Sequence, residues 1–222
     1  MTTITLDQAK AAANFLVKDA GADIIWPDNP IRQAVVFGLA AVNAIKGSGW
    51  NLAVAQQYVS VTLPGVGAAQ SLLGQVPYIG GLLVSLTSSL VHPTIFLSPA
   101  AASDPIQLLA TIMHELGHVG QIRKGGPLWC LDYGVTGEVR AIAEAPCYAT
   151  TMDILVYIGG VNPNDAEGVV LSALQSYGIT GPDMDLAHAI ILSNTESLLA
   201  GADPGEAALT VKSALIATGW TP

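Results

Sequence analysis

Two histidines with a glutamate between them are the residues of this sequence whose types and spacing could do chemistry. They stand in an HExxH arrangement, with His114 and His118 four residues apart and Glu115 directly after the first histidine. On a helix, side chains four residues apart share a face at about 5–6 Å, so both imidazoles can ligate one zinc ion. Glu115 then lies beside the metal, where it can deprotonate a water molecule whose pKa the metal has lowered.

The segment around the motif carries the signals of a helix, without which the spacing means nothing. Asp104 can cap its start, Pro105 suits its first position, and Gly-Gly-Pro at 125–127 predicts its end. Apolar residues cover one broad side of this helix, whereas the two histidines share the other side with Gln107, Thr111 and Gln121. One face can pack and the other can hold a metal. This context favours a zinc site over an incidental match of five residues.

A third metal ligand must come from elsewhere in the chain. Catalytic zinc usually takes three protein ligands and leaves a fourth position open. The extended metzincin motif is absent, because Lys124 stands where its last histidine would be. A downstream carboxylate is therefore expected, and the candidates are Glu138, Glu144 and Asp132. The two glutamates are about 240° apart around a helix, so only one of them can face the metal.

Two stretches of sequence, one at the motif and one downstream of it, extend the pattern. Residues 114–121 read HELGHVGQ, and Glu144 is followed by a small and an aromatic residue, Cys147 and Tyr148. These runs resemble the minimal gluzincin type of zinc metallopeptidase, which places a short strand, an HELxHxxQ helix and a glutamate-bearing helix in this order. The resemblance covers residues 94–151.

The resemblance implies a ligand set, a cofactor and a class of substrate. It implies that Zn²⁺ is bound by His114, His118 and one glutamate, and that a peptide or protein is cleaved. Glu144 stands at the family's glutamate position. Glu138 remains the alternative, because it follows His118 by twenty residues, a separation like that of the thermolysin-like gluzincins.

A peptidase of this kind also needs a donor for the oxyanion that develops on the attacked carbonyl. The side chains that could donate to it are those of Tyr133, Tyr148, Tyr157 and His188. Among them we take His188 as the first choice. The expected catalytic residues are therefore Glu115 and His188.

The composition is that of an apolar and acidic protein. Of its 222 residues, 51% are hydrophobic and 11% are charged, and the mean hydropathy is +0.50. A formal charge of −9 repels phosphate backbones, so nucleic-acid binding is not expected. The first residues lack the basic start and apolar core of a secretory signal. We therefore expect a cytoplasmic protein or one exported by a non-classical route.

The stretch 47–103 contains no Asp, Glu, Lys or Arg. A membrane-spanning helix needs about 20 apolar residues in a row, and prolines, glycines and glutamines interrupt this stretch. Buried core and loops are therefore favoured over membrane or partner contact. Thr-Ile-Phe-Leu at 94–97 predicts a short strand beside the motif helix, and its edge could pair with an extended substrate.

Hydrophobic periodicity predicts a mainly helical α+β fold. We expect one zincin-like helical domain over residues 1–222, with a small sheet or single strand beside the motif helix. The motif region would span 94–158 and the C-terminal helical portion 160–222. Further helices are predicted at 5–20, 30–46, 136–158, 164–177, 182–200 and 204–217.

Two details of this scheme concern single pairs of residues. Asp203 and Glu206 are expected to cap the last helix. Cys130 and Cys147 are equally compatible with a disulfide and with two thiols.

These patterns favour a zinc-dependent metalloendopeptidase. The alternative is a non-catalytic structural or assembly protein that keeps a zinc site for stability. A membrane-associated protease is a further possibility, but it is disfavoured by the acidic composition.

Overall fold

Helices make up most of the computed structural model, which describes residues 3–33, 35–36, 60–63, 93–176 and 179–222. The helices are α1 (Leu6–Asp19), α6 (Pro105–Val135), α7 (Gly137–Tyr157), α8 (Pro163–Ser176), α9 (Pro182–Leu199) and α10 (Glu206–Ala217). The strands are β1 (Asp23–Ile25), β2 (Val61–Leu63) and β3 (Thr94–Phe96), and a short 3-10 helix covers Ala101–Ser103. The predicted mainly helical, α+β class is confirmed.

The N-terminal helix begins where the sequence predicts. Thr5 caps α1, and its hydroxyl accepts a hydrogen bond from the Gln8 backbone N–H at 3.2 Å. The Gln8 side chain accepts one from the Thr5 N–H at 2.9 Å, which completes a capping box.

The predicted start of the last helix is wrong. Gly205 is the residue before α10, and no side chain caps this helix, so Asp203 and Glu206 do not form the expected pair. Gly205 lies so close to Asp153 of α7 that a Cβ at this position would overlap the Asp153 carboxylate. The chain is extended at this contact, and the helix begins only after it.

The three strands form one sheet in the order β1-β3-β2. β3 runs parallel to β1, with Ile95 opposite Ile24, and antiparallel to β2, with Ile95 opposite Thr62. Both edges of β3 are therefore occupied. The hypothesis that the strand at 94–97 offers an edge to a substrate is wrong, because its partners come from segments that are distant in the sequence.

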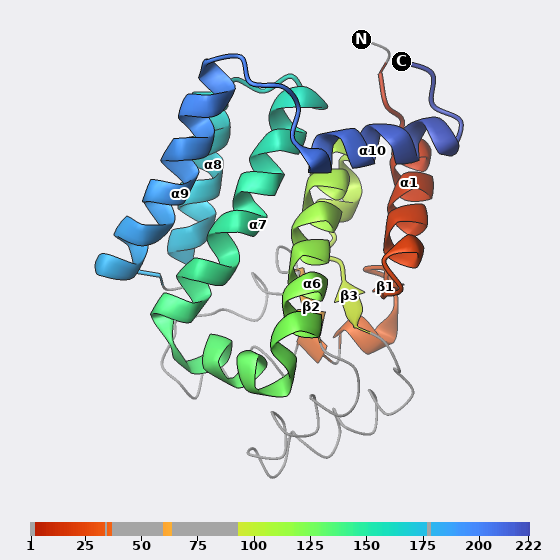
Figure 1. Cartoon of the computed structure of the whole chain (residues 1–222). Coiled ribbons are helices and arrows are strands. Elements are labelled where there is room, and N and C mark those ends of the chain that lie inside the picture. Colours follow the sequence, from red (N-terminus) through yellow and green to blue (C-terminus); the bar gives the residue numbers. More distant parts are fainter. Residues whose placement is uncertain (1–2, 34, 37–59, 64–92, 177–178) are drawn as a thin grey trace.

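α6 and α7 pack side by side at the centre of the described part of the chain (Figure 1). α8 and α9 pack against α7, whereas α1 packs against α6 and α10 crosses over α1. One cluster of buried apolar side chains joins these helices, including Leu16 of α1, Leu109 of α6, Met152 of α7 and Val211 of α10. This core fixes the two central helices relative to each other, and the candidate site lies between them.

Two predicted features lie largely outside the described residues. They are the helix at 30–46 and most of the uncharged stretch 47–103. Within the part that the structure describes, no helix is both long enough and apolar enough to span a membrane.

Candidate metal centre

The motif lies in the first half of α6. Asp104 precedes the helix, and its Oδ1 accepts hydrogen bonds from the backbone N–H groups of Ile106 and Gln107 at 2.9 and 2.8 Å. This is the predicted N-cap. The predicted helix end at 125–127 is wrong, because helical backbone continues to Val135. Figure 1 shows that the last part of α6 turns away from the first, which fits a proline in the helix that has no N–H to donate.

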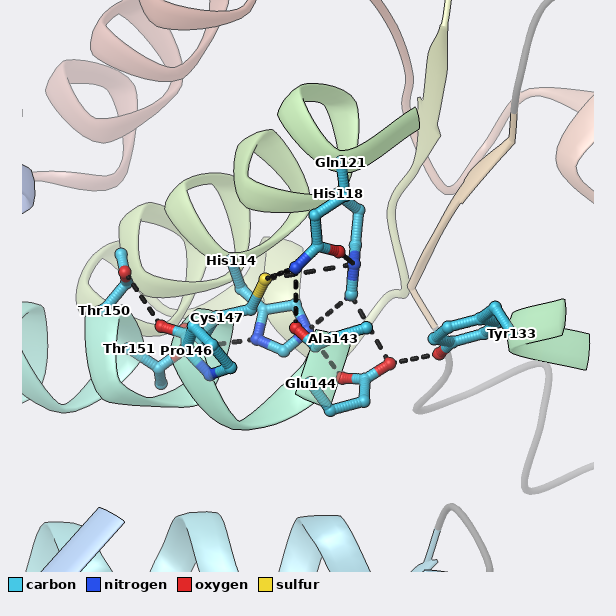
Figure 2. A network of polar contacts seen from close by, with 10 residues as sticks. All are labelled: His114, His118, Gln121, Tyr133, Ala143, Glu144, Pro146, Cys147, Thr150 and Thr151. Carbon is cyan, nitrogen blue, oxygen red and sulfur yellow. Dashed lines mark hydrogen bonds and ion pairs between the residues drawn. The ribbon is translucent and has the colours of Figure 1, made fainter. Parts of the chain in front are cut away.

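His114, His118 and Glu144 project from α6 and α7 toward one point (Figure 2). His114 Nε2 lies 3.1 Å from His118 Nε2 and 3.2 Å from Glu144 Oε2. His118 Nε2 lies 3.4 Å from Glu144 Oε1. All three residues are buried, with exposed fractions of 5%, 8% and 1%. They form a group that could hold a metal ion.

The donor spacing fits a small tetrahedral ion. Zinc binds nitrogen and oxygen ligands at about 2.0–2.1 Å, and a tetrahedron of that size separates its donors by about 3.3–3.4 Å. The two histidine nitrogens, 3.1 Å apart, and the pair His114 Nε2 and Glu144 Oε2, 3.2 Å apart, are close to this spacing. The 3.4 Å separation from His118 Nε2 is to the other carboxylate oxygen, Oε1. In addition, Glu144 Oε2 is buried and has no hydrogen-bond partner among the described residues. A buried anionic oxygen of this kind is suited to a cation.

Contacts within the cluster shift the pKa values of Glu144 and His118 in the direction opposite to that expected from burial. Burial alone would raise the pKa of Glu144, but the ion-pair contacts of its two oxygens with His114 and His118 hold this pKa well below its usual range. Burial would lower the pKa of His118, yet hydrogen bonds with Cys147 and Glu144 and the Glu144 charge raise it well above its usual value. Without a metal, these two shifts favour a protonated His118 beside an ionised Glu144.

His118 is oriented by an amide. Its Nδ1 lies 2.8 Å from Gln121 Oε1, and Gln121 Nε2 donates a hydrogen bond to the Ala143 carbonyl at 2.8 Å. Since the carbonyl can only accept, the amide orientation is fixed and Nδ1 of His118 must carry the proton. Nε2 is then the nitrogen that faces the metal position. Partners of this kind fix the tautomer and ring direction of metal ligands.

His114 is oriented by α7. Thr151 donates a hydrogen bond to the Cys147 carbonyl at 3.2 Å, and its hydroxyl oxygen lies 3.5 Å from His114 Nδ1. The Tyr148 ring packs edge-on against the His114 ring, with centroids 4.4 Å apart. Both contacts leave Nε2 directed at the cluster.

Gly117 lets the two central helices approach each other. A Cβ at this position would lie 2.6 Å from Cys147 Sγ, and this buried sulfur contacts Gln121 Nε2 at 3.7 Å and His118 Nδ1 at 3.9 Å. Sequence reasoning assigned no role to Gly117, because its requirement comes from a residue thirty positions away.

We expect Gly117→Ala to lower the free energy of unfolding by about 1–3 kcal/mol, because the added methyl group overpacks against Cys147. Zinc affinity should fall as well, since the sulfur must leave its place beside His118. Thermal unfolding and zinc titration measure both effects. Gly120→Ala is the matched control: apart from its own helix backbone and its chain neighbours, no atom lies within 4 Å of its added Cβ, and a helical glycine replaced by alanine stabilises by about 0.5–1 kcal/mol. Equal stability of the two variants would contradict the packing argument, and adding Cys147→Ala should restore part of the loss.

Tyr133 is a second contributor whose contact with a ligand the sequence does not reveal. Its hydroxyl donates a hydrogen bond to Glu144 Oε1. Burial and then the neighbouring Glu144 charge raise the pKa of Tyr133 well above its usual value, so the phenol is a neutral donor. Sequence reasoning named it only as one candidate for the oxyanion.

Glu115 lies beside a cavity of about 350 Å³ that is walled in part by His114. Glu115 itself is buried, with 3% of its surface exposed. Apart from these two, the described side chains that line the cavity are uncharged, and many are small: they include Ser98, Ala101, Ala110, Thr111, Val170 and Ala173. Glu115, the candidate general base, therefore borders a cavity whose other described walls, apart from His114, are uncharged.

The other candidate residues lie elsewhere or outside the described side chains. Glu138 is in the first turn of α7 and is exposed. His188 is on α9, half-exposed, with Nε2 3.7 Å from Glu167 Oε1, and the structure does not bring it to the cluster. The side chains of Asp132 and Cys130 are not among those described, and Cys147 is a buried free thiol.

The raised pKa of His118 predicts a pH dependence of metal binding. Because this pKa is raised, we expect the metal-free His118 to hold its proton at pH 7 and to release about one proton when a metal binds. Zinc affinity should therefore weaken by about tenfold for each unit that the pH falls through the neutral range. Calorimetric titrations in two buffers of different ionisation enthalpy count the released proton. Binding without proton release would show that His118 is neutral in the metal-free protein.

The structure thus brings three of the residues expected to hold the metal, His114, His118 and Glu144, into one buried group that could hold a metal ion. Sequence alone had left Glu138 and Glu144 open, and the geometry places Glu144 with the histidines. Comparison of the chain with protein-family models, with curated proteins and with solved structures yields no match.

Proposed function

We propose that this chain is a zinc-dependent metalloendopeptidase of the gluzincin type. The observation that carries the proposal is the His114, His118 and Glu144 group, whose donor spacing suits zinc, with Glu115 next to it at the wall of a cavity. A structural zinc site has no need of the adjacent glutamate or of the cavity. A hydrolytic site needs both.

Each residue would have a separate task. His114, His118 and Glu144 would hold Zn²⁺, which when bound lowers the pKa of a coordinated water and polarises the substrate carbonyl. Glu115 would take the proton from the attacking water and later give it to the leaving amine. The cavity would receive a side chain of the peptide, and its uncharged walls favour apolar residues over charged ones.

Tyr148 is the best-placed donor for the oxyanion in this proposal. It lines the same cavity as Glu115 and packs against His114, whereas His188 lies on α9 beside Glu167. Tyr148→Phe should lower kcat by about 10²–10³-fold and leave zinc binding unchanged, which is the usual loss for one oxyanion donor. Steady-state kinetics and metal analysis test this, and an unchanged kcat would show that another group donates to the oxyanion.

The burial of all three ligands favours one alternative function, a non-catalytic zinc site that stabilises the fold. The deciding experiment combines metal analysis with hydrolysis of a quenched fluorescent peptide library. The peptidase proposal expects one zinc per chain, cleavage after apolar-rich sequences, loss of cleavage with a chelator and recovery with added zinc. A chelator that lowers the melting temperature of a protein with no measurable cleavage would support the structural alternative.

A further inference from the structure

The two oxygens of the Glu144 carboxylate have different surroundings (Figure 2). Oε1 accepts a hydrogen bond from the Tyr133 hydroxyl and lies 3.4 Å from His118 Nε2. Oε2 is shut off from solvent, has no hydrogen-bond partner among the described residues and lies 3.2 Å from His114 Nε2. Oε2 thus lacks the hydrogen bond that Oε1 receives, so it is the oxygen left available to a cation.

Tyr133 lies near the end of α6 and is held in place by contacts with both central helices. Its ring contacts that of His118, with centroids 6.0 Å apart. Its backbone carbonyl accepts a hydrogen bond from Arg140 Nη1 of α7 at 3.3 Å. The hydroxyl is thus fixed at one side of the carboxylate, in the way that Gln121 is fixed beside His118.

We propose that Tyr133 is a positioning residue that makes Glu144 bind the metal through Oε2 alone. The inference rests on the proposed metal site. A hydrogen bond to Oε1 competes with coordination by that oxygen and holds the carboxylate at one angle. Glu144 then fills one coordination position instead of two, and a position remains for water or substrate.

Cobalt(II) in place of zinc reports the coordination number, because its visible absorption is strong in four-coordinate sites and weak at higher coordination. We expect an intense band from the cobalt-loaded wild-type chain. Tyr133→Phe keeps the ring and removes the hydroxyl, so its band should weaken as Oε1 joins the metal, and cobalt affinity should fall by about 10–100-fold. Tyr157→Phe is the control, because Tyr157 is the last residue of α7 and its hydroxyl donates to the Ala202 carbonyl beyond α9, so its spectrum should match the wild type.

The outcomes separate this inference from the function on which it rests. A wild-type chain that binds no cobalt overturns the metal site and the proposed function together. Cobalt binding with identical spectra for wild type and Tyr133→Phe overturns the role of Tyr133 alone. If the variant fails to fold, X-ray absorption of the zinc-loaded wild-type chain decides: one close carboxylate oxygen supports the proposal, and two overturn it.

Discussion

Glu115→Gln is expected to bind one zinc ion with wild-type affinity and to lose about 10²–10⁴-fold in kcat/KM. Glutamine has the same shape as glutamate but cannot accept the proton of the attacking water. The three metal-binding side chains are unchanged, so zinc content should stay at one per chain. Metal analysis and initial rates on a quenched fluorescent peptide measure the two quantities on the same sample.

Glu138→Gln provides the matched control for this variant. It makes the same chemical change on an exposed residue in the first turn of α7. Its zinc content and kcat/KM should equal those of the wild type. If Glu115→Gln cleaves as fast as Glu138→Gln, the general base is another group, and loss of zinc from Glu115→Gln would mean that Glu115 supports the metal itself.

The parts of the site that sequence could predict are those set by local spacing. The HExxH motif required only that residues 114–118 be helical, and the Asp104 cap and apolar periodicity were sufficient to predict that helix. In contrast, the choice between Glu138 and Glu144 depends on how α7 is rotated against α6. That rotation follows from tertiary packing, including the contact of Gly117 with Cys147, which no local pattern records.

The errors at the fold level have the same origin. The strand predicted at 94–97 was hypothesised to pair one edge with a substrate, but residues 23–25 and 61–63, distant in the sequence, pair with both of its edges. The helix end predicted at 125–127 became a bend, and the last turns of α6 carry Tyr133 to the carboxylate of Glu144. Local signals indicated where the backbone changes direction, whereas long-range contacts determined which segments the chain then meets.

Glu144→Ala should lower zinc affinity by more than about a hundredfold, which is beyond the loss expected for an outer-sphere partner. The variant keeps both histidines but removes the third donor of the group. Hydrolysis should fall to background at zinc concentrations that saturate the wild type. Competition with a fluorescent chelator gives the dissociation constant, and circular dichroism confirms that the helices remain.

The metal-free form of Glu144→Ala should also be less stable, by about 1–3 kcal/mol. The carboxylate compensates the charge of buried His118 and accepts a hydrogen bond from the Tyr133 hydroxyl. Its removal leaves both of these groups without that partner. The loss stays moderate because His118 can give up its proton once the carboxylate is gone. Glu138→Ala, on the exposed turn of the same helix, should change neither zinc affinity nor stability by a measurable amount. If Glu138→Ala loses the metal and Glu144→Ala keeps it, the ligand assignment is reversed, because a residue that holds the ion cannot be removed without weakening its binding.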